Sequence, residues 1–180
     1  MVDPSKPAAG KIPNEGTEKG PESARARAAR VSREALRFDP AGPWRILAFD
    51  YGIKRTGLAV TDPMRIIATG LDGIDTLKLL PYLAAYLTKE PVGLFLVGYP
   101  LDLDGNPTHA TPAVDIFLRQ LAKRWPWIPV QKGDERFTSR DAMQSLVASG
   151  VRKKARRDKH LLDEVSATLI LQDYMAGLSP

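Results

Sequence analysis

The sequence contains no cysteine and only two histidines, His109 and His160. Without cysteine the chain can form no disulfide framework, no thiolate zinc site and no cysteine nucleophile. The groups left for a catalytic or metal-binding site are therefore mainly carboxylates, of which the chain has 21. Because oxygen ligands favour hard cations, a metal site in this chain is expected to hold Mg²⁺ or Mn²⁺.

Long apolar runs are also missing. No segment approaches the roughly 18–20 consecutive apolar residues that a membrane-spanning helix needs. The N-terminus lacks the cationic start and apolar stretch of a secretory signal. We therefore expect a cytoplasmic protein without a membrane partner. Hydrophobic residues make up 43% of the 180 residues, which is enough for one buried core.

Residues 1–43 contain little of what builds a core. The segment is rich in Pro, Gly, Ala, Lys, Arg and Glu, and it has no aromatic residue before Phe38. Such a composition cannot bury enough apolar surface to offset the chain entropy lost on folding. We therefore predict that residues 1–43 form a disordered basic extension and that the folded domain spans residues 44–180.

Positive charge is concentrated in one segment. The formal net charge of the chain is +5, and residues 151–160 (VRKKARRDKH) hold six Lys or Arg against one Asp. A concentrated basic patch is typical of proteins that bind polyanions, although a solvated loop can have the same composition. The residues of this segment that we expect to bind a nucleic-acid substrate are Arg152, Lys153, Lys154, Arg156 and Arg157.

Short apolar runs alternate with helical periodicity from residue 44 onward. The predicted strands lie at 46–49, 55–60, 66–74, 92–97 and near 129–131, and the predicted helices lie at 76–89, 111–124, 139–149 and 161–175. For the first helix, Thr76 is a candidate cap and Leu77 begins the inward apolar stripe. This order predicts an α/β fold with a mixed five-stranded sheet flanked by helices, in which a hairpin meander precedes parallel crossovers.

One candidate catalytic carboxylate follows the first strand. Asp50 is expected to project at the carboxyl end of a central strand, beside the turn at Asp50-Tyr51-Gly52. Ligand sites of open α/β sheets collect at such strand ends. In an Asp-x-Gly sequence the carboxylate can instead only cap the turn.

Two further candidates follow later elements. The tripeptide Asp134-Glu135-Arg136 comes after the last strand, and its arginine could neutralise a carboxylate or contact phosphate. Asp163 opens the last predicted helix and shares an inward stripe with Ala167. Its neighbour Glu164 competes with it as the acid that complements the helix dipole. Small residues at Ser166 and Ala167 would let this helix approach the sheet closely.

Oxygen ligands from three distant segments suit Mg²⁺ or Mn²⁺, and such sites drive phosphodiester hydrolysis. In a two-metal site the ions lie about 3.5–4 Å apart, and they activate water and stabilise the leaving oxygen. Asp50 would be the natural bridging ligand between the two ions. The other acids would complete the shell of one ion each.

Four blocks of the sequence occur in the order of a known family. They are LAFDYGIKRTGLAV (47–60), VGYPLDLDG (97–105), DERFTS (134–139) and LDEVSATLILQ (162–172). Together they resemble the YqgF family, described as RuvC-like Holliday junction resolvases and as pre-16S rRNA nucleases with an RNase H-like fold. The resemblance implies an active site at Asp50, Glu135 and Asp163, which would be both the catalytic residues and the metal ligands.

The same blocks contain further expected contacts and one departure. We expect Lys54, Arg55 and Arg136 to bind the substrate. Asp102 stands where the second block of the family usually has Asn. This extra acid could alter metal or substrate contacts, or it could be neutral variation.

The resemblance implies a metal-dependent nuclease that acts on precursor 16S rRNA at its 5′ end. A resolvase of four-way DNA junctions and a non-catalytic nucleic-acid-binding factor are the alternatives. The partner is therefore RNA or branched DNA, and the protein is a monomer or a homodimer. Asp-x-Gly followed by Lys and Gly also resembles the first phosphate loop of the actin and sugar-kinase superfamily. That superfamily needs two such lobes, and the chain is long enough for only one.

Overall fold

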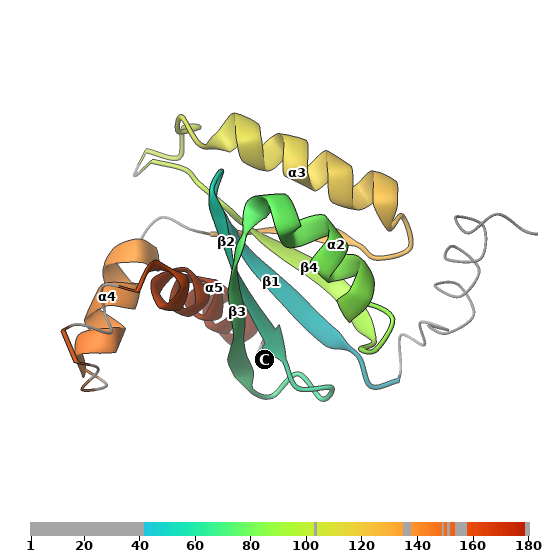
Figure 1. Cartoon of the computed structure of the whole chain (residues 1–180), viewed down its shortest axis with the longest axis horizontal. Helices are drawn as coiled ribbons and strands as arrows, with labels where there is room; N and C mark the ends of the chain where they lie inside the picture. Colours follow the sequence, from blue (N-terminus) through green and yellow to red (C-terminus); the bar gives the residue numbers. More distant parts are fainter. Residues whose placement is uncertain are drawn as a thin grey trace, which may run out of the picture.

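A mixed five-stranded sheet forms the centre of the structure (Figure 1). The computed structural model describes residues 42–102, 104–134, 138–148, 150, 152–153 and 158–178. Its strands are β1 (Arg45–Tyr51), β2 (Arg55–Thr61), β3 (Ala68–Asp75), β4 (Val92–Tyr99) and β5 (Val130–Asp134). Their spatial order is β3-β2-β1-β4-β5, so β1 is the central strand.

The sheet combines two kinds of strand pairing. β1, β2 and β3 form an antiparallel meander, whereas β1 pairs with β4, and β4 with β5, in parallel. The parallel connections pass through helices, as parallel pairing requires. The α/β class, the mixed five-stranded sheet and the predicted order of pairing are confirmed.

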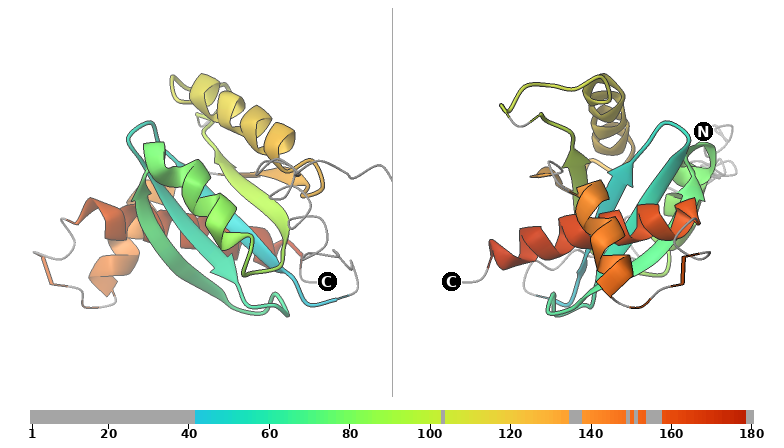
Figure 2. Two further views of the ribbon diagram at one scale, coloured as in Figure 1. Left: turned by 45° about the vertical axis from the view of Figure 1, so that its right-hand side comes forward. Right: turned by 90° about the vertical axis from the view of Figure 1, so that its left-hand side faces the viewer.

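Helices cover both faces of the sheet (Figure 2). One face carries α2 (Thr76–Tyr86) and α3 (Thr111–Arg124), and the other carries α5 (Lys159–Ala176) with α4 (Thr138–Ala148) packed against it. Alternate residues of β1 pack into the two hydrophobic cores on opposite faces of the sheet. Leu47 and Phe49 belong to the cluster under α2 and α3, while Ile46 and Ala48 belong to the cluster under α5.

The first part of the chain departs from the prediction in two places. Asp50 and Tyr51 are still within β1, so the hairpin turn lies at Gly52 to Lys54 and not at Asp50-Tyr51-Gly52. The third strand begins at Ala68 because Ile66 and Ile67 donate their backbone N–H groups to the Asp62 carboxylate. These bonds use the groups that would otherwise extend the strand ladder.

The helices also differ in detail. The side chain of Leu77 is 94% exposed, whereas Leu79 and Leu83 are buried, so the inward stripe of α2 starts two residues later than predicted. Thr76 is not a cap, because its hydroxyl donates to the carbonyl oxygen of Gly52. Asp158 caps α5 by accepting the His160 N–H, which moves Asp163 from the first helical turn to the second.

Two further predictions concern the N-terminal extension and membrane-spanning helices. The extension at 1–43 lies outside the described residues except for its last two positions. Within the described part of the chain, no helix has the length and apolar character needed to cross a membrane.

Candidate active site

Asp50 lies at the carboxyl end of the central strand and faces α5. Its side chain continues the alternation of Ile46 and Ala48, which pack under that helix. Phe49 pairs with Val97 in the parallel neighbour, and Tyr99 of the same neighbour pairs with Asp134 at the end of β5. The carboxyl ends of β1, β4 and β5 therefore meet at one edge, and Asp50 stands at that edge.

Asp50 belongs to a row of glycines that crosses the sheet. Its partner on β2 is Gly57, and the partner of Gly57 on β3 is Gly73. On the other side, Gly98 follows the Val97 that pairs with Phe49, and Gly98 pairs with Gly133 on β5. Asp50 is thus the one position of this row with a side chain.

The glycines allow the first turns of α5 to lie directly on the sheet. A Cβ atom built on Gly57 would overlap the carbonyl oxygen of Asp163, and one built on Gly73 would overlap the backbone of His160. Gly70 accommodates the side chain of Glu164 in the same way. Ser166 and Ala167 are buried, as predicted for a close approach of this helix. The backbone of Asp163 is therefore fixed over the residue that pairs with Asp50.

The Asp163 carboxylate forms an ion pair with Arg55. The Arg55 Nε lies 2.7 Å from the Asp163 Oδ2, and the two side chains are 28% and 21% exposed. Arg55 lies two residues before Gly57 on β2 and shares its face of the sheet. Arg55 was predicted as a substrate contact, and in this structure it holds a predicted metal ligand.

Asp50 and Asp163 are the kind of donors that suit Mg²⁺ or Mn²⁺, because both offer carboxylate oxygens on one face of the sheet. Glu135 and Arg136 lie outside the described residues. Glu135 follows directly after the last residue of β5. Among the described residues, no group of three or more His, Cys, Asp or Glu side chains could hold a metal ion.

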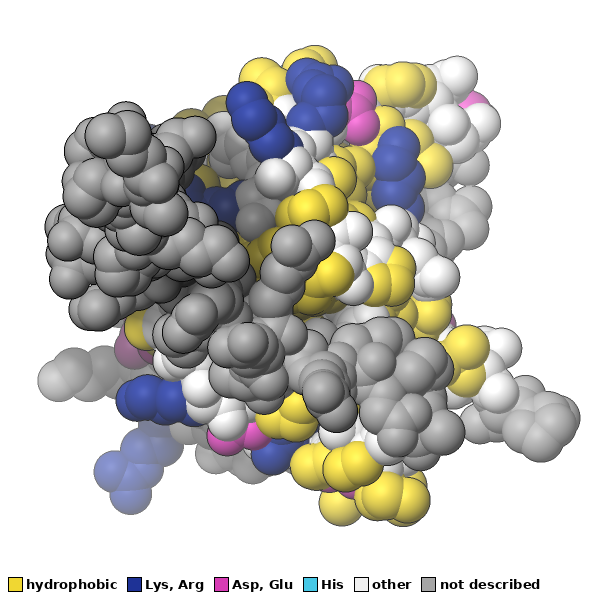
Figure 3. All heavy atoms as spheres, turned by 90° about the vertical axis from the view of Figure 1, so that its right-hand side faces the viewer, with side chains coloured by type: hydrophobic (Ala, Val, Ile, Leu, Met, Phe, Trp, Pro, Cys, Tyr) yellow, Lys and Arg dark blue, Asp and Glu magenta, His cyan; other side chains and the backbone are white. Residues whose placement is uncertain are grey.

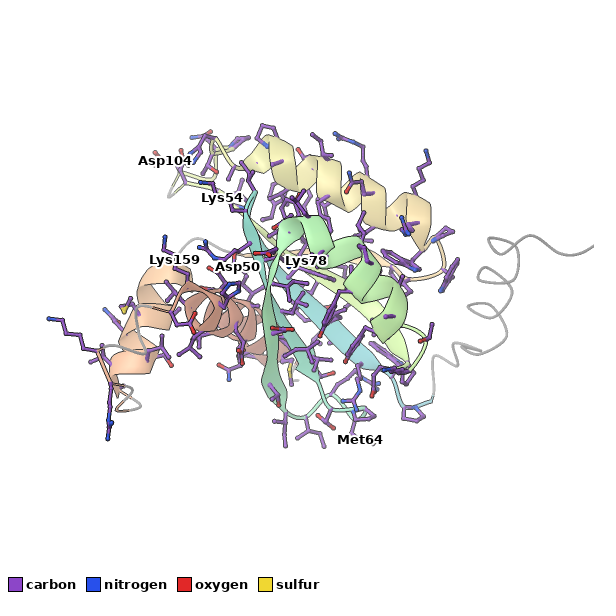
Figure 4. All side chains as sticks on the ribbon, in the orientation of Figure 1. Asp50, Lys54, Met64, Lys78, Asp104 and Lys159 are labelled. Atoms are coloured by element: carbon purple, nitrogen blue, oxygen red, sulfur yellow. The ribbon has the colours of Figure 1, made fainter. Side chains whose placement is uncertain are left out.

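Several cations surround this end of the sheet. In the view of Figure 4 the labelled side chains of Lys54, Lys78 and Lys159, from the turn after β1, α2 and α5, lie toward the same end of the sheet as Asp50. The Thr76 backbone N–H donates to the Lys54 carbonyl, and the ring nitrogen Nδ1 of His160 lies 2.5 Å from the Gly73 carbonyl oxygen, so the starts of α2 and α5 both contact this end of the sheet. Arg152 and Lys153 are exposed between α4 and α5. Lys154, Arg156 and Arg157 lie outside the described residues.

Sequence reasoning missed some residues of this site. Lys78 and His160 were assigned no role in the site, although Lys78 follows Leu77 and His160 ends the basic segment 151–160. The glycines were missed as well, although Gly57 and Gly73 interrupt predicted strands, and an isolated glycine inside a strand marks a close approach. That signal was available in the sequence.

Asp102, the departure from the family pattern, organises its own loop. Its carboxylate accepts hydrogen bonds from the backbone N–H groups of Asn106 and Asp104 at 2.8 Å and 3.0 Å. The Asn106 bond is the largest cause that holds the pKa of the Asp102 carboxyl below its ordinary value. This local role accounts for an acid at this position without a metal contact.

Glu164 lies over the edge of the sheet rather than beside Arg55. Burial raises the pKa of Glu164, and the negative charge of Asp72 raises it further. A carboxyl that resists ionisation is a poor ligand for a cation, and this counts against Glu164 as a candidate ligand.

Comparison with known proteins gives consistent matches. The family model named RuvX and described as "Holliday junction resolvase" matches residues 44–177. A protein of Christiangramia forsetii named "Putative pre-16S rRNA nuclease" is 47% identical over 131 residues, which cover 73% of this chain and 97% of that protein. A protein of Porphyromonas gingivalis with the same name is also 47% identical, over 73% of this chain and 95% of its own length.

A solved structure is similar in its fold. It is the Fowlpox virus resolvase in complex with Holliday junction DNA, with a TM-score of 0.51 over 76% of this chain and 99% of that chain. The sequence identity is 15%, so this likeness concerns the fold alone. The sheet order and the flanking helices are accordingly those of an RNase H-like fold.

Proposed function

The chain belongs to the RuvX family, which confirms the resemblance to YqgF, and from this we propose that it is a metal-dependent nuclease acting on structured nucleic acid. We further propose that it acts in the cytoplasm on precursor 16S rRNA and matures the 5′ end. The observation that carries the proposal is the position of Asp50 in a row of glycines, with Asp163 fixed over its strand partner.

The proposed ligands for Mg²⁺ or Mn²⁺ are Asp50, Glu135 and Asp163. A divalent cation bound there would lower the pKa of a water molecule and stabilise charge on the leaving oxygen. The role of the protein is to hold the carboxylates in place. Asp50 is held by the central strand, and Asp163 by the contact of its backbone with Gly57.

The cations of the site have a separate role. A phosphodiester that approaches two or three carboxylates meets like charge, and nearby cations lower this repulsion. Lys54, Arg55 and Arg136 are proposed to do so close to the cleaved bond. The basic residues between α4 and α5 are proposed to bind phosphates further away.

A second candidate is cleavage of four-way DNA junctions, which the description of the family favours. A junction presents two symmetric strands, so a resolvase would act as a homodimer with two sites related by a two-fold axis. A monomer is sufficient for trimming an RNA end. The oligomeric state during cleavage therefore separates the two candidates.

The proposal is tested by incubating the purified protein with labelled precursor rRNA and with a labelled DNA four-way junction. Each reaction contains Mg²⁺, Mn²⁺ or EDTA. We expect metal-dependent cleavage of the RNA, and we expect Asp50→Asn to abolish cleavage while it preserves or slightly strengthens binding. Removing a negative charge lessens the repulsion of phosphate even as it dismantles the metal site. Cleavage of the junction alone would instead support the second candidate.

The same assay examines the other proposed ligands. Glu135→Gln and Asp163→Asn are each expected to be as damaging as Asp50→Asn, and the double variant scarcely worse, because groups that act as one unit are not additive. A fully active Asp163→Asn would transfer the ligand role to Glu164 or Asp134. Binding without any cleavage under all conditions would support a non-catalytic factor.

A further inference from the structure

Two large apolar side chains are exposed beside the candidate active site. Ile53 lies in the turn between β1 and β2 and is 74% exposed, and Leu77 lies in the first turn of α2 and is 94% exposed. Neither belongs to either core cluster of the described residues. Ile53 is three residues from Asp50 along the chain. Both side chains are therefore exposed at the end of the sheet where β1 carries Asp50.

Hydrogen bonds hold the two apolar residues on one unit. The Thr76 hydroxyl donates to the Gly52 carbonyl at 2.6 Å, and the Thr76 backbone N–H donates to the Lys54 carbonyl at 3.1 Å. Ile53 lies between these two acceptors, and Leu77 directly follows the donor. The turn and the start of α2 are thus joined by two bonds, so Ile53 and Leu77 keep a defined separation.

Lysines flank the apolar pair. Lys54 follows Ile53 and is exposed, and Lys78 follows Leu77. The Lys78 ammonium lies 3.1 Å from the Asp75 carboxylate, but it is 78% exposed and accessible to other anions. In the view of Figure 4 both labelled lysines lie toward the end of the sheet that carries Asp50. The surface therefore offers apolar contact and positive charge within reach of the proposed cleavage site.

Unpaired nucleotides match this combination of apolar and cationic groups. A paired duplex hides the faces of its bases within the stack, whereas unpaired nucleotides expose them to side chains. Aliphatic side chains such as Ile and Leu are used in other proteins as wedges against base steps. The phosphates next to such a base would lie where the lysines can bind them.

We propose that Ile53 and Leu77 form an apolar wedge that contacts an unpaired nucleobase of the substrate, while Lys54 and Lys78 bind the adjacent phosphates. The proposal rests on the proposed nuclease function and adds a substrate class to it. The preferred substrate has an unpaired nucleotide next to the cleaved bond. The protein would then distinguish unpaired from paired regions of the substrate at the turn between β1 and β2 and not at the carboxylates.

The chain offers a matched control at the opposite end of the sheet. Met64 and Ile66 lie in the loop between β2 and β3 and are 66% and 72% exposed. Figure 4 shows Met64 far below Asp50 in that orientation, and Figure 3 shows hydrophobic side chains gathered at the same lower end of the molecule. Because β2 runs away from Asp50 toward this loop, the control pair is apolar and exposed but remote from the carboxylates.

The test compares Ile53→Ser/Leu77→Ser with Met64→Ser/Ile66→Ser. Binding is measured by fluorescence anisotropy, without divalent metal, to an RNA duplex that carries one bulged nucleotide and to the same duplex fully paired. The wild-type protein is expected to prefer the bulged RNA. Loss of the wedge should weaken binding to the bulged RNA by about 5- to 10-fold, comparable to the lower end of what stacking of a base on an aromatic side chain contributes, and should leave duplex binding unchanged.

The control variant should bind both RNAs as the wild type does. The wedge hypothesis fails if the wild type shows no preference, if the wedge variant keeps the preference, or if both variants lose it equally. Leu77→Ser alone provides a milder variant, and thermal melts show whether each variant is folded. Because this test measures binding alone, its outcome is independent of the cleavage assay. A protein that prefers the bulged RNA here but cuts nothing in the cleavage assay would refute the nuclease and leave the wedge intact.

Discussion

At the scale of the residue, Arg55 connects two roles that the sequence suggests separately. Its guanidinium neutralises the Asp163 carboxylate within a partly buried pair. A cation bound by Asp163 would compete with this arginine for the same oxygens. Arg55 is therefore a counterion that a divalent metal bound at Asp163 would have to displace, at least in part.

We predict that Arg55→Ala raises the affinity of the protein for Mn²⁺, measured by titration calorimetry, because the competing cation is removed. The free energy of unfolding should fall by about 1 kcal/mol, as expected for a pair that is partly open to solvent. Arg45→Ala is the matched control. The Arg45 Nε lies 2.8 Å from the Glu90 Oε2, and this ion pair is remote from the site. An equal change of Mn²⁺ affinity in both variants would show that the Arg55 pair plays no special part.

Asp102 provides a prediction about pH. Its pKa is lower in the folded chain than its ordinary value, so the ionised carboxylate stabilises the fold above that ordinary value, and this contribution is lost as the pH falls through the lowered pKa. Asp102→Asn should therefore be less stable than the wild type at neutral pH, and the difference should shrink in acid. Urea unfolding across this range measures it. A difference that does not vary with pH would point to a change of loop shape.

At the scale of the element, the position of α5 depends on glycine. Gly57 and Gly73 are cross-strand partners, and α5 lies on both with backbone atoms. A backbone contact cannot be relieved by rotating a side chain, so any larger residue has to displace the helix or the strand. The placement of Asp163 over the sheet is thus set by two residues that take no part in the chemistry.

We predict that Gly57→Ala lowers the free energy of unfolding by about 3 kcal/mol or more, at the upper end of what overpacking costs, and that cleavage falls with it. Gly177→Ala is the control, because a Cβ there would meet its nearest neighbour, the Tyr174 carbonyl oxygen, at 3.5 Å. Denaturant unfolding of the two variants measures the difference. Equal and small effects would mean that α5 shifts without cost, and its contact with Gly57 would then not hold Asp163.

Other features of the elements followed from local pattern only in part. The helix at 111–124 was predicted with its observed bounds, since its apolar residues recur at helical spacing between clear ends. For α2 the same reasoning identified the helix but assigned Leu77 to the buried stripe. The leucines at 77, 79 and 80 fit more than one stripe, and contact with the sheet selects the stripe that contains Leu79 and Leu83.

At the scale of the whole molecule, positive charge is concentrated in the segment of the sequence that leads into α5. The segment 151–160 joins α4 to α5, and α5 carries Asp163. We propose that the domain at 44–180 binds nucleic acid across this segment and the end of β1. The extension at 1–43 is proposed to add only weak contacts.

We predict that changing six residues of the segment to Ala weakens nucleic-acid binding regardless of sequence. These residues are Arg152, Lys153, Lys154, Arg156, Arg157 and Lys159. Each phosphate contact contributes roughly 0.7–0.9 to the steepness of log K against log salt. The loss of about three contacts should therefore flatten this slope by about 2–3. Turnover at saturating substrate should fall much less than affinity. An unchanged salt slope would mean that the nucleic acid binds another face of the molecule.

The sequence by itself determined the order of strands and helices, the mixed sheet and the place of Asp50 at the end of a central strand. These features depend on periodicity within short segments, which can be read without knowing what each segment contacts. The resemblance to YqgF, which rests on blocks in sequence order, was likewise available from the sequence.

Only the tertiary structure decided that Arg55 pairs with Asp163, that glycines surround Asp50 in one row, and that Ile53 and Leu77 remain exposed together. Each of these depends on strand register or on how closely α5 and α2 approach other segments. Arg55 and Asp163 are 108 positions apart in the chain. No local pattern encodes such a distance, because it results from the packing of the whole sheet and its helices.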